Sequence, residues 1–268
     1  MTRSHRLMTA VAALAATLVP VSANAGVGDL LVAPTRIVLT NGRGTEVLLN
    51  NIGEEEATYR VSAELRRMTP DGQLIEVEDP TEAERLAQEM IYFAPRRVTL
   101  PPGQPQAIRI AARAPQGLAD GEYRVHLLFR AIPKPRPVEK REVGGGMSFR
   151  LIPVYGVSIP VIVRFGQLEV DTTITDVRTT NERAIEVDLK RAGDRSTYGA
   201  IEITKDGEEM PIAEIRGIAL YTEIADRTVK VPVRGDYQGT LSGPVKVTYR
   251  EHPNDGGAVI AAYDAVLP

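Results

Sequence analysis

The sequence predicts an all-β chain made of two sandwich domains, and three observations support this fold class. Short runs rich in Val, Ile, Thr and Tyr recur between Gly, Pro, Asn and Asp residues, at the roughly ten-residue spacing typical of sandwiches and barrels. The pattern ends and restarts at Phe165-Gly166-Gln167. Cysteine is absent, so no disulfide frame is available and each domain needs an adequate apolar core.

Each half of the chain carries about seven expected strands, the strand number of an immunoglobulin-like sandwich. In the first half they lie near residues 30–39, 45–50, 58–68, 97–100, 106–111, 121–131 and 147–165. In the second half they lie near residues 168–174, 184–189, 199–205, 215–221, 228–233, 243–249 and 259–266. One helix is expected at 81–90, because Thr81 can cap it and Leu86 and Met90 fall on one face.

Residues 1–25 are expected to be a secretory leader. Two arginines give a positive start, residues 7–21 form an apolar stretch, and Ala23-Asn24-Ala25 gives the small-x-small pattern that precedes cleavage. The alternative is a membrane anchor, which the short run interrupted by Pro20 disfavours. We therefore expect a periplasmic protein that starts at Gly26, with domains at 26–165 and 166–268.

Composition and side chains point away from an enzyme or a nucleic-acid binder. The formal net charge is −3, aromatic residues make up 5% and Trp is absent, which leaves little to attract phosphates or stack on bases. Of the three histidines, His5 lies in the leader, His126 in an apolar strand and His252 in a turn. We expect His126 to be a hydrogen-bonded structural imidazole, and we expect no metal, no cofactor and no catalytic site.

The segment 133–146 alternates Pro with other residues and ends in three glycines, so it cannot be a core strand. Two interpretations remain open for it. It is either a solvated hairpin loop or an arm that contacts a partner through Lys134, Arg136, Lys140 and Arg141.

Three stretches of the first half resemble one family in their order and spacing. They are Ala-Pro-Thr-Arg-Ile-Val-Leu at 33–39 with Val-Leu-Leu-Asn-Asn at 47–51, the Pro-rich segment at 93–110, and Gly-Glu-Tyr-Arg-Val-His-Leu-Leu-Phe-Arg-Ala-Ile-Pro at 121–133. Together they are similar to the periplasmic pilus or fimbrial assembly chaperones of the chaperone-usher pathway. The resemblance covers nearly all of residues 28–165 and is looser beyond.

This resemblance implies a boomerang-shaped chaperone that binds one secreted pilus or fimbrial subunit and delivers it to an outer-membrane usher. The chaperone lends a long strand that completes the sandwich of the subunit, a recognition mode known as donor-strand complementation. The alternative is an exported structural or adhesive module with the same two sandwiches, since fold alone does not settle function.

The strand expected to be lent lies at 149–164, where nearly every position is apolar on both faces. A register shift of one residue would exchange the two faces of the strand, so that Ile152 and Val154 would face the subunit instead of their neighbours. An ordinary central strand is the other interpretation, which Pro153 and Pro160 disfavour because proline cannot donate to a ladder. The resemblance assigns to the subunit groove Leu151, Pro153, Tyr155 and Val157.

The resemblance also implies a role for Arg36, which matches the cleft arginine that receives the C-terminal carboxylate of the subunit. The alternative is an arginine solvated at a strand end. The family's second anchor, a lysine on the long strand, has no counterpart, because Ser158 or Pro160 occupies its place. Arg150 is a candidate replacement.

Glu122 and Arg164 match an interdomain ion pair of the same family. Their alternative interpretation is a pair of surface charges, which would contribute little to stability.

Overall fold

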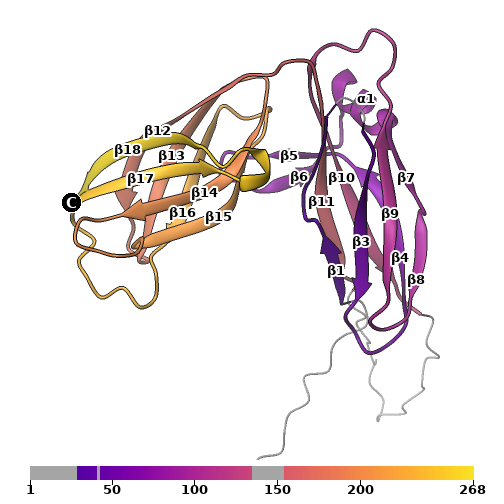
Figure 1. The fold of residues 1–268 in the computed structure, drawn as a ribbon, viewed down its shortest axis with the longest axis horizontal. Coiled ribbons are helices and arrows are strands. Elements are labelled where there is room, and N and C mark those ends of the chain that lie inside the picture. The colour runs from indigo at the N-terminus through magenta and orange to yellow at the C-terminus, as the bar shows by residue number, and fades with distance from the viewer. Residues whose placement is uncertain (1–28, 41–42, 135–153) are drawn as a thin grey trace, which may run out of the picture.

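The computed structural model describes residues 29–40, 43–134 and 154–268. Figure 1 shows two β-sandwiches that meet at one end and diverge in a boomerang shape. The expected all-β fold class with two sandwiches is confirmed. Within the described residues, no helix has the length and apolar character needed to cross a membrane.

The first sandwich packs a four-stranded sheet, in the order β1-β3-β9-β7, against a five-stranded sheet, in the order β2-β11-β10-β4-β8. Its core alternates along the strands, so that Val47, Leu49 and Ile108 of one sheet meet Leu127 and Phe129 of the other. The strands are β1 Leu30–Ala33, β2 Ile37–Thr40, β3 Thr45–Asn51, β4 Ala57–Glu64, β5 Arg66–Met68, β6 Leu74–Glu76, β7 Ile91–Ala94, β8 Arg97–Leu100, β9 Pro105–Ala112, β10 Gly121–Ile132 and β11 Gly156–Phe165.

The second sandwich pairs a three-stranded sheet, in the order β12-β13-β16, with a four-stranded sheet, in the order β15-β14-β17-β18. A separate core that includes Ile185, Ile201 and Val247 fills the space between its sheets. Its elements are β12 Val170–Thr179, β13 Ala184–Gly193, β14 Thr197–Thr204, β15 Ala213–Leu220, β16 Asp226–Pro232, β17 Gly243–Glu251, the 3-10 helix η1 Pro253–Asp255 and β18 Val259–Leu267.

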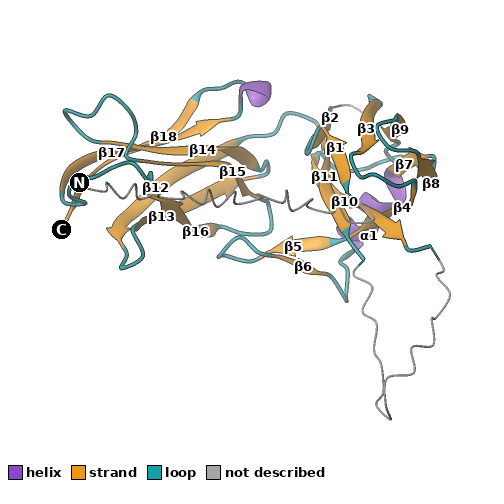
Figure 2. Cartoon of the chain, turned by 90° about the horizontal axis from the view of Figure 1, so that it is seen from below, coloured by secondary structure: helices purple, strands orange, loops and turns teal. Residues whose placement is uncertain are grey.

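The expected single strand at 30–39 is wrong, because the structure divides it between the two sheets. β1 pairs with β3, whereas β2 runs parallel to β11 on the other side of the sandwich. Pro34 lies between them and has no N–H to continue a ladder. The expected strand at 58–68 is likewise divided, into β4 and β5, and the hairpin of β5 with β6 was not predicted. Figure 2 shows this hairpin reaching alongside the second sandwich.

The single expected helix is confirmed as α1 Glu82–Met90. Thr81 caps it, since the Thr81 side chain accepts from the Glu84 backbone N–H and the Glu84 carboxylate accepts from the Thr81 N–H at 2.7 Å. Arg67 donates two hydrogen bonds to the same carboxylate, at 2.7 and 2.6 Å. These bonds lower the pKa of Glu84 to about 2, so the charge that holds α1 to the β5–β6 hairpin persists over the physiological pH range.

The chain passes from the first sandwich to the second through Gly166, whose φ is +79°. A Cβ at this position would clash with the side chain of Asp120. Both the backbone angle and the close approach therefore require glycine.

Candidate functional site

One edge of β11 is only partly covered. The strand pairs with β10 along its whole length, but on its other edge it pairs with β2 at Val161–Arg164 alone. In the described part of the chain, no strand pairs with residues 156–160 on this edge. An uncovered edge presents N–H and C=O groups that a strand of another chain can pair with.

The side chains in and just before β11 differ in how far this chain buries them. Val161 and Val163 are buried in the first core, and Ile162, on the opposite face, is buried against the second sandwich. Ile159 is also buried in the first core, whereas Val154 and Tyr155, which precede β11, are 40% and 59% exposed. The apolar character on both faces of residues 161–163 is thus explained by burial within this chain, whereas that of residues 154 and 155 is not.

The residues expected in the subunit groove have different placements. Leu151 and Pro153 lie outside the described residues, as does the greater part of the expected loop at 133–146. The Tyr155 carbonyl accepts a hydrogen bond from the Ala131 N–H at 3.0 Å, which leaves its side chain exposed beside β10. Val157 is partly buried and packs against the first core, so at least part of its surface serves this chain's own fold.

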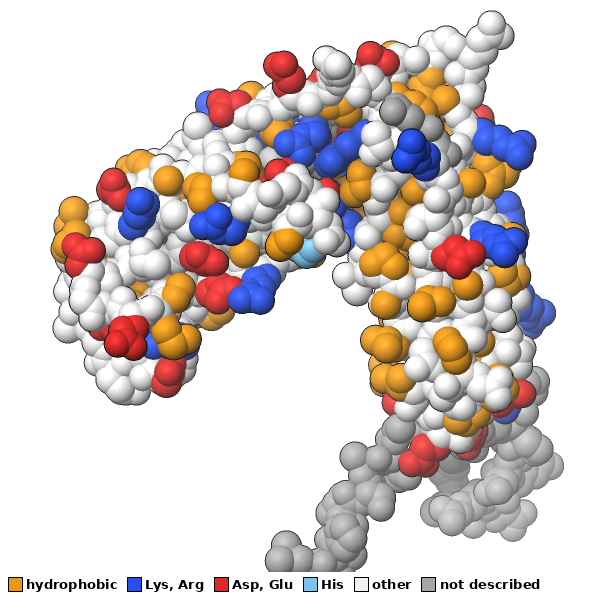
Figure 3. Space-filling model, viewed as in Figure 1, with side chains coloured by type: hydrophobic (Ala, Val, Ile, Leu, Met, Phe, Trp, Pro, Cys, Tyr) orange, Lys and Arg blue, Asp and Glu red, His pale blue; other side chains and the backbone are white. Residues whose placement is uncertain are grey.

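Exposed apolar side chains also gather elsewhere on the first sandwich. Figure 3 shows hydrophobic side chains over the face where Figure 1 places β1 and β3. Leu31, Leu48 and Ile52 are each at least half exposed there. Exposed apolar groups that cluster in this way are typical of protein interaction sites.

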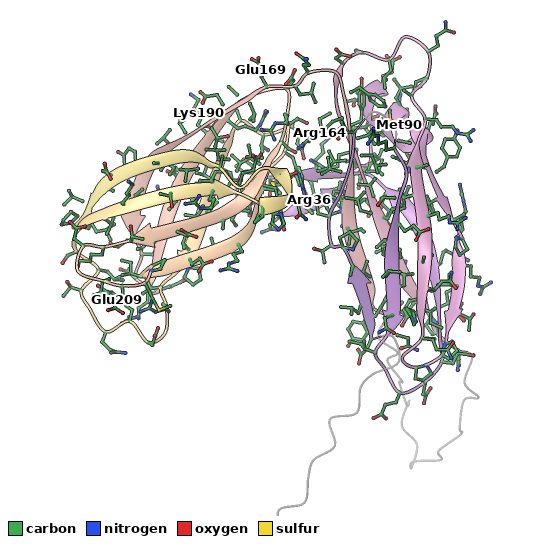
Figure 4. All side chains as sticks on the ribbon, viewed as in Figure 1. Arg36, Met90, Arg164, Glu169, Lys190 and Glu209 are labelled. Atoms are coloured by element: carbon green, nitrogen blue, oxygen red, sulfur yellow. The ribbon has the colours of Figure 1, made fainter. Side chains whose placement is uncertain are left out.

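Arg36 lies where the free edge of β11 ends. It directly precedes β2, whose first residue Ile37 pairs with Val161. Its side chain is only 10% exposed, its Nη1 donates to Asp255 Oδ2 at 2.7 Å, and its guanidinium lies 4.7 Å from the ring centre of Tyr198. The interpretation of Arg36 as a solvated strand-end arginine is therefore wrong. Figure 4 shows Arg36 at the junction of the two sandwiches.

The guanidinium of Arg36 is not fully used by this contact. Its Nε and Nη2 are buried and have no hydrogen-bond partner among the described residues. A buried donor without a partner destabilises a structure by about 1–3 kcal/mol. The arrangement therefore retains the capacity to bind a second carboxylate.

Asp255 was not predicted as part of the site. It ends η1, in the connection between β17 and β18, where the His252 Nδ1 accepts from the Asn254 N–H at 3.2 Å. The only sequence signal for it is a turn-like Pro-Asn-Asp-Gly-Gly segment at 253–257, some 219 positions from Arg36. The expected basic helper Arg150 lies outside the described residues.

Glu122 and Arg164 face each other directly across β10 and β11. The Arg164 Nε donates to Glu122 Oε2 at 2.9 Å, and the same oxygen accepts from the backbone N–H of Ser196 in the second sandwich at 3.1 Å. Arg164 also donates to the Ser196 carbonyl at 3.2 Å. The Glu122 side chain is 1% exposed, so this pair is buried at the junction and is not a pair of surface charges.

A second polar contact at the junction was not predicted. Arg124 donates to Glu223 at 2.6 Å, and the Met68 N–H donates to the same carboxylate at 2.7 Å. The Arg124 guanidinium lies 3.6 Å from the ring centre of Tyr221, a cation–π arrangement. Between these polar contacts lies an apolar cluster of Met68, Ile162, Ala219, Tyr221 and Ile224.

His126 is buried beside this cluster but is not hydrogen-bonded, so that part of the expectation is wrong. It is 1% exposed, its ring meets Tyr221 edge to face at 6.4 Å, and neither ring nitrogen has a partner among the described residues. Burial, followed by the charges of Arg124 and Arg66, lowers the pKa of His126 to about 3. The imidazole is therefore neutral at physiological pH.

No protein-family model and no curated protein matches the chain. Among solved structures, it is similar to the Pseudomonas aeruginosa CupB2 chaperone, with 15% identity, a TM-score of 0.46 and coverage of 89% of this chain and 100% of that one. It is also similar to a Salmonella enterica structure of the SafA pilin in complex with the SafB chaperone, with 15% identity, a TM-score of 0.45 and coverage of 89% and 96%. A third similar structure, the YadV chaperone, has 15% identity, a TM-score of 0.47 and coverage of 89% and 100%.

Proposed function

We propose that this chain is a periplasmic chaperone that holds a secreted pilus-like subunit by lending it β11 as a strand, and that it delivers the subunit to an outer-membrane usher. The observation that carries this proposal is the edge of β11 that no described strand covers, which ends at a buried arginine with donors that have no partner among the described residues. Addition of a strand to such an edge satisfies backbone groups on both chains at once.

The direction of this edge gives Arg36 its role. A strand laid parallel to β11 along residues 156–160 runs toward β2, and its carboxyl end meets Arg36 because Ile37 already pairs with Val161. A terminal carboxylate there would accept from Nε and Nη2, which lack partners among the described residues. Such a charge-assisted pair is stronger than a neutral hydrogen bond. Asp255 holds the remaining side of the guanidinium.

Apolar side chains supply most of the affinity in this proposal. Tyr155 is exposed beside the free edge, and the sequence resemblance places Leu151, Pro153 and Val157 in the same subunit groove. Each apolar side chain that becomes fully buried contributes about 1.5–3 kcal/mol. Several such residues, with Arg36 as the anchor, are sufficient for a stable one-to-one complex.

Periplasmic co-expression with small secreted subunits, followed by purification of the complex, tests the proposal. Leu151→Ser with Tyr155→Ser should weaken capture by several kcal/mol, about a hundredfold or more, and leave the free fold intact. Tyr92→Ser, at an exposed tyrosine of β7 in the other sheet, is the matched control and should leave capture unchanged. Arg36→Ala should abolish stable capture without a change in secondary structure.

Two results would contradict the proposal. If serine at 151 and 155 unfolds the free protein, these residues belong to its own core and β11 is not lent. If the Arg36→Ala variant captures the subunit as well as the wild type does, Arg36 is not the anchor. The addition of a strand is then tested by the Leu151→Ser, Tyr155→Ser variant alone.

The proposed organisation of the mature chain is a start at Gly26 and two separately folding domains at 26–165 and 166–268. The two independent cores support this division. N-terminal sequencing of the exported protein checks the start. Limited proteolysis checks the division, since cleavage should concentrate between β11 and β12 and leave two resistant fragments.

A further inference from the structure

Three arginines lie side by side across one sheet face of the first sandwich. Arg60 of β4 pairs directly with Arg97 of β8 on one side and with Arg130 of β10 on the other. All three are exposed, and they point to the same face because directly paired residues of antiparallel strands do so. We call Arg60, Arg97 and Arg130 the arginine ladder.

The arginine ladder has no counter-charge in the described part of the chain. None of its three guanidinium groups takes part in an ion pair or a hydrogen bond there, and the neighbouring row on the same face is an uncharged pair, Thr58 and Thr99, bonded at 2.9 Å. Like charges directly opposite each other destabilise a sheet. The ladder therefore destabilises the free protein, and an anionic partner would remove that effect.

A groove of about 580 Å³ extends the basic surface beyond the arginine ladder. Arg60, Arg96 and Arg97 line it, together with Phe93, Gln88 and residues of β4, and no acidic side chain is among its lining residues in the described chain. Arg96 lies over the Phe93 ring, 5.0 Å from its centre. The ladder and the groove thus form one continuous cationic surface.

The arginine ladder ends at the free edge of β11. Arg130 pairs directly with Gly156, the first residue of β11, and this position belongs to the stretch with an uncovered edge. Neighbouring strands lie about 4.8 Å apart, so a strand added at the edge would lie about 10 Å from β10. Gly156 has no side chain of its own to separate such a strand from Arg130, and the nearest side-chain atom to the space above it is Leu128 Cδ1, 3.0 Å from where a Cβ would lie.

We infer that the arginine ladder is a docking surface for acidic side chains on the subunit strand that adds to β11. This inference rests on the proposed function and names the kind of partner. The added strand turns apolar side chains toward the core and carboxylates toward the outer face, where a Glu opposite Gly156 reaches Arg130. The continuity of the ladder with the free edge favours an acidic protein strand over a lipid surface.

Labelled peptides of about ten residues, the length of a long strand, test the inference by fluorescence anisotropy. Strictly alternating Val-Glu, Val-Thr and Val-Lys peptides present the same outward residue in every register that turns Val toward the core. The wild-type protein should bind the Val-Glu peptide about tenfold more tightly than the Val-Thr peptide and the Val-Lys peptide least tightly. High ionic strength should remove these differences.

Variants of the arginine ladder sharpen the test. Arg60→Glu with Arg97→Glu and Arg130→Glu should reverse the order, so that the Val-Lys peptide binds best. Changing the same three positions to Gln should remove the preference for the Val-Glu peptide. This variant tests the inference if the Glu variant fails to fold. The matched control changes three exposed arginines elsewhere, Arg113, Arg216 and Arg250, to Glu and should keep the wild-type order.

The outcomes separate this inference from the proposed function. Binding of the Val-Thr peptide without a preference for Val-Glu overturns the inference and leaves strand addition supported. Binding of the Val-Glu peptide that depends on the ladder, with no binding of Val-Thr, supports the acidic docking surface and counts against strand addition. No binding of any peptide overturns both. Ladder-dependent binding to phosphatidylglycerol vesicles with no peptide preference assigns the surface to lipid and also overturns the inference.

Discussion

The two halves of β11 have similar apolar sequences but different surroundings. Residues 161–164 lie between β10 and β2. Val161 and Val163 are buried on one face and Ile162 on the other. Residues 156–160 have β10 on one side and no strand on the other within the described chain, and they follow the exposed Val154 and Tyr155. An apolar sequence therefore indicates that the faces of a strand are buried, but it does not tell whether the same chain or a partner buries them.

The largest expected effect is in the enclosed half. Ile162→Ala removes a fully buried side chain from the apolar cluster between the sandwiches. We expect a loss of about 4 kcal/mol in the free energy of unfolding, from lost burial and the cavity left behind. Urea unfolding measures it, and a loss below about 1 kcal/mol would show that this half is not enclosed in solution.

The next largest effect concerns Arg164, the charged residue of the enclosed half that lies at the junction of the sandwiches. Glu122→Gln leaves Arg164 buried without its counter-ion, since Glu122 Oε2 accepts from both Arg164 and Ser196. We expect a destabilisation of about 3 kcal/mol. Glu46→Gln, at an exposed pair with Arg109, is the control and should stay within about 0.5 kcal/mol of the wild type in urea unfolding.

A third, smaller effect is dependence on pH at the point where the halves meet, since His126 pairs with Pro160. The folded-state pKa of about 3 lies below the ordinary value of 6.5, so only the unfolded chain binds the proton as the pH falls below 6.5. His126 therefore destabilises the fold by up to about 1.4 kcal/mol per pH unit between 6.5 and 3, or about 2 kcal/mol at pH 5 relative to pH 7.

His126→Phe isolates this contribution from that of the carboxylates. The variant should lose about 2 kcal/mol less than the wild type between pH 7 and pH 5 in urea unfolding. Equal losses in the two proteins would mean that the imidazole takes up a proton in the folded state.

The smallest expected effect is at Tyr155, which directly precedes the open half. Tyr155→Ser should change the free energy of unfolding by no more than about 0.5 kcal/mol, because the side chain is exposed in the free protein. Taken with Ile162→Ala, it measures the contrast between the two halves directly. A destabilisation of 155 comparable to that of 162 would show that the strand is enclosed along its whole length.

The sequence allowed much of the fold to be predicted, because alternating strands and the Thr81 capping box are local signals. The division of residues 30–39 between two sheets was missed, since it depends on which distant strands β1 and β2 pair with. The junction was only partly foreseen. Glu122 and Arg164 came from the family resemblance, whereas Glu223 and Asp255 were missed because no local pattern links them to Arg124 and Arg36.

β2 begins at Ile37, opposite Val161, and therefore limits how far another strand can extend along this edge of β11. In the described chain, the five residues 156–160 have no strand on this edge, and at about 3.3 Å per residue they span roughly 17 Å, the length of an average strand. A guest chain that slid further would collide with β2, and one that stopped short would leave Arg36 out of reach of its terminal carboxylate. In the proposed complex, the position of β2 would thus fix the register of the strand that binds beside β11.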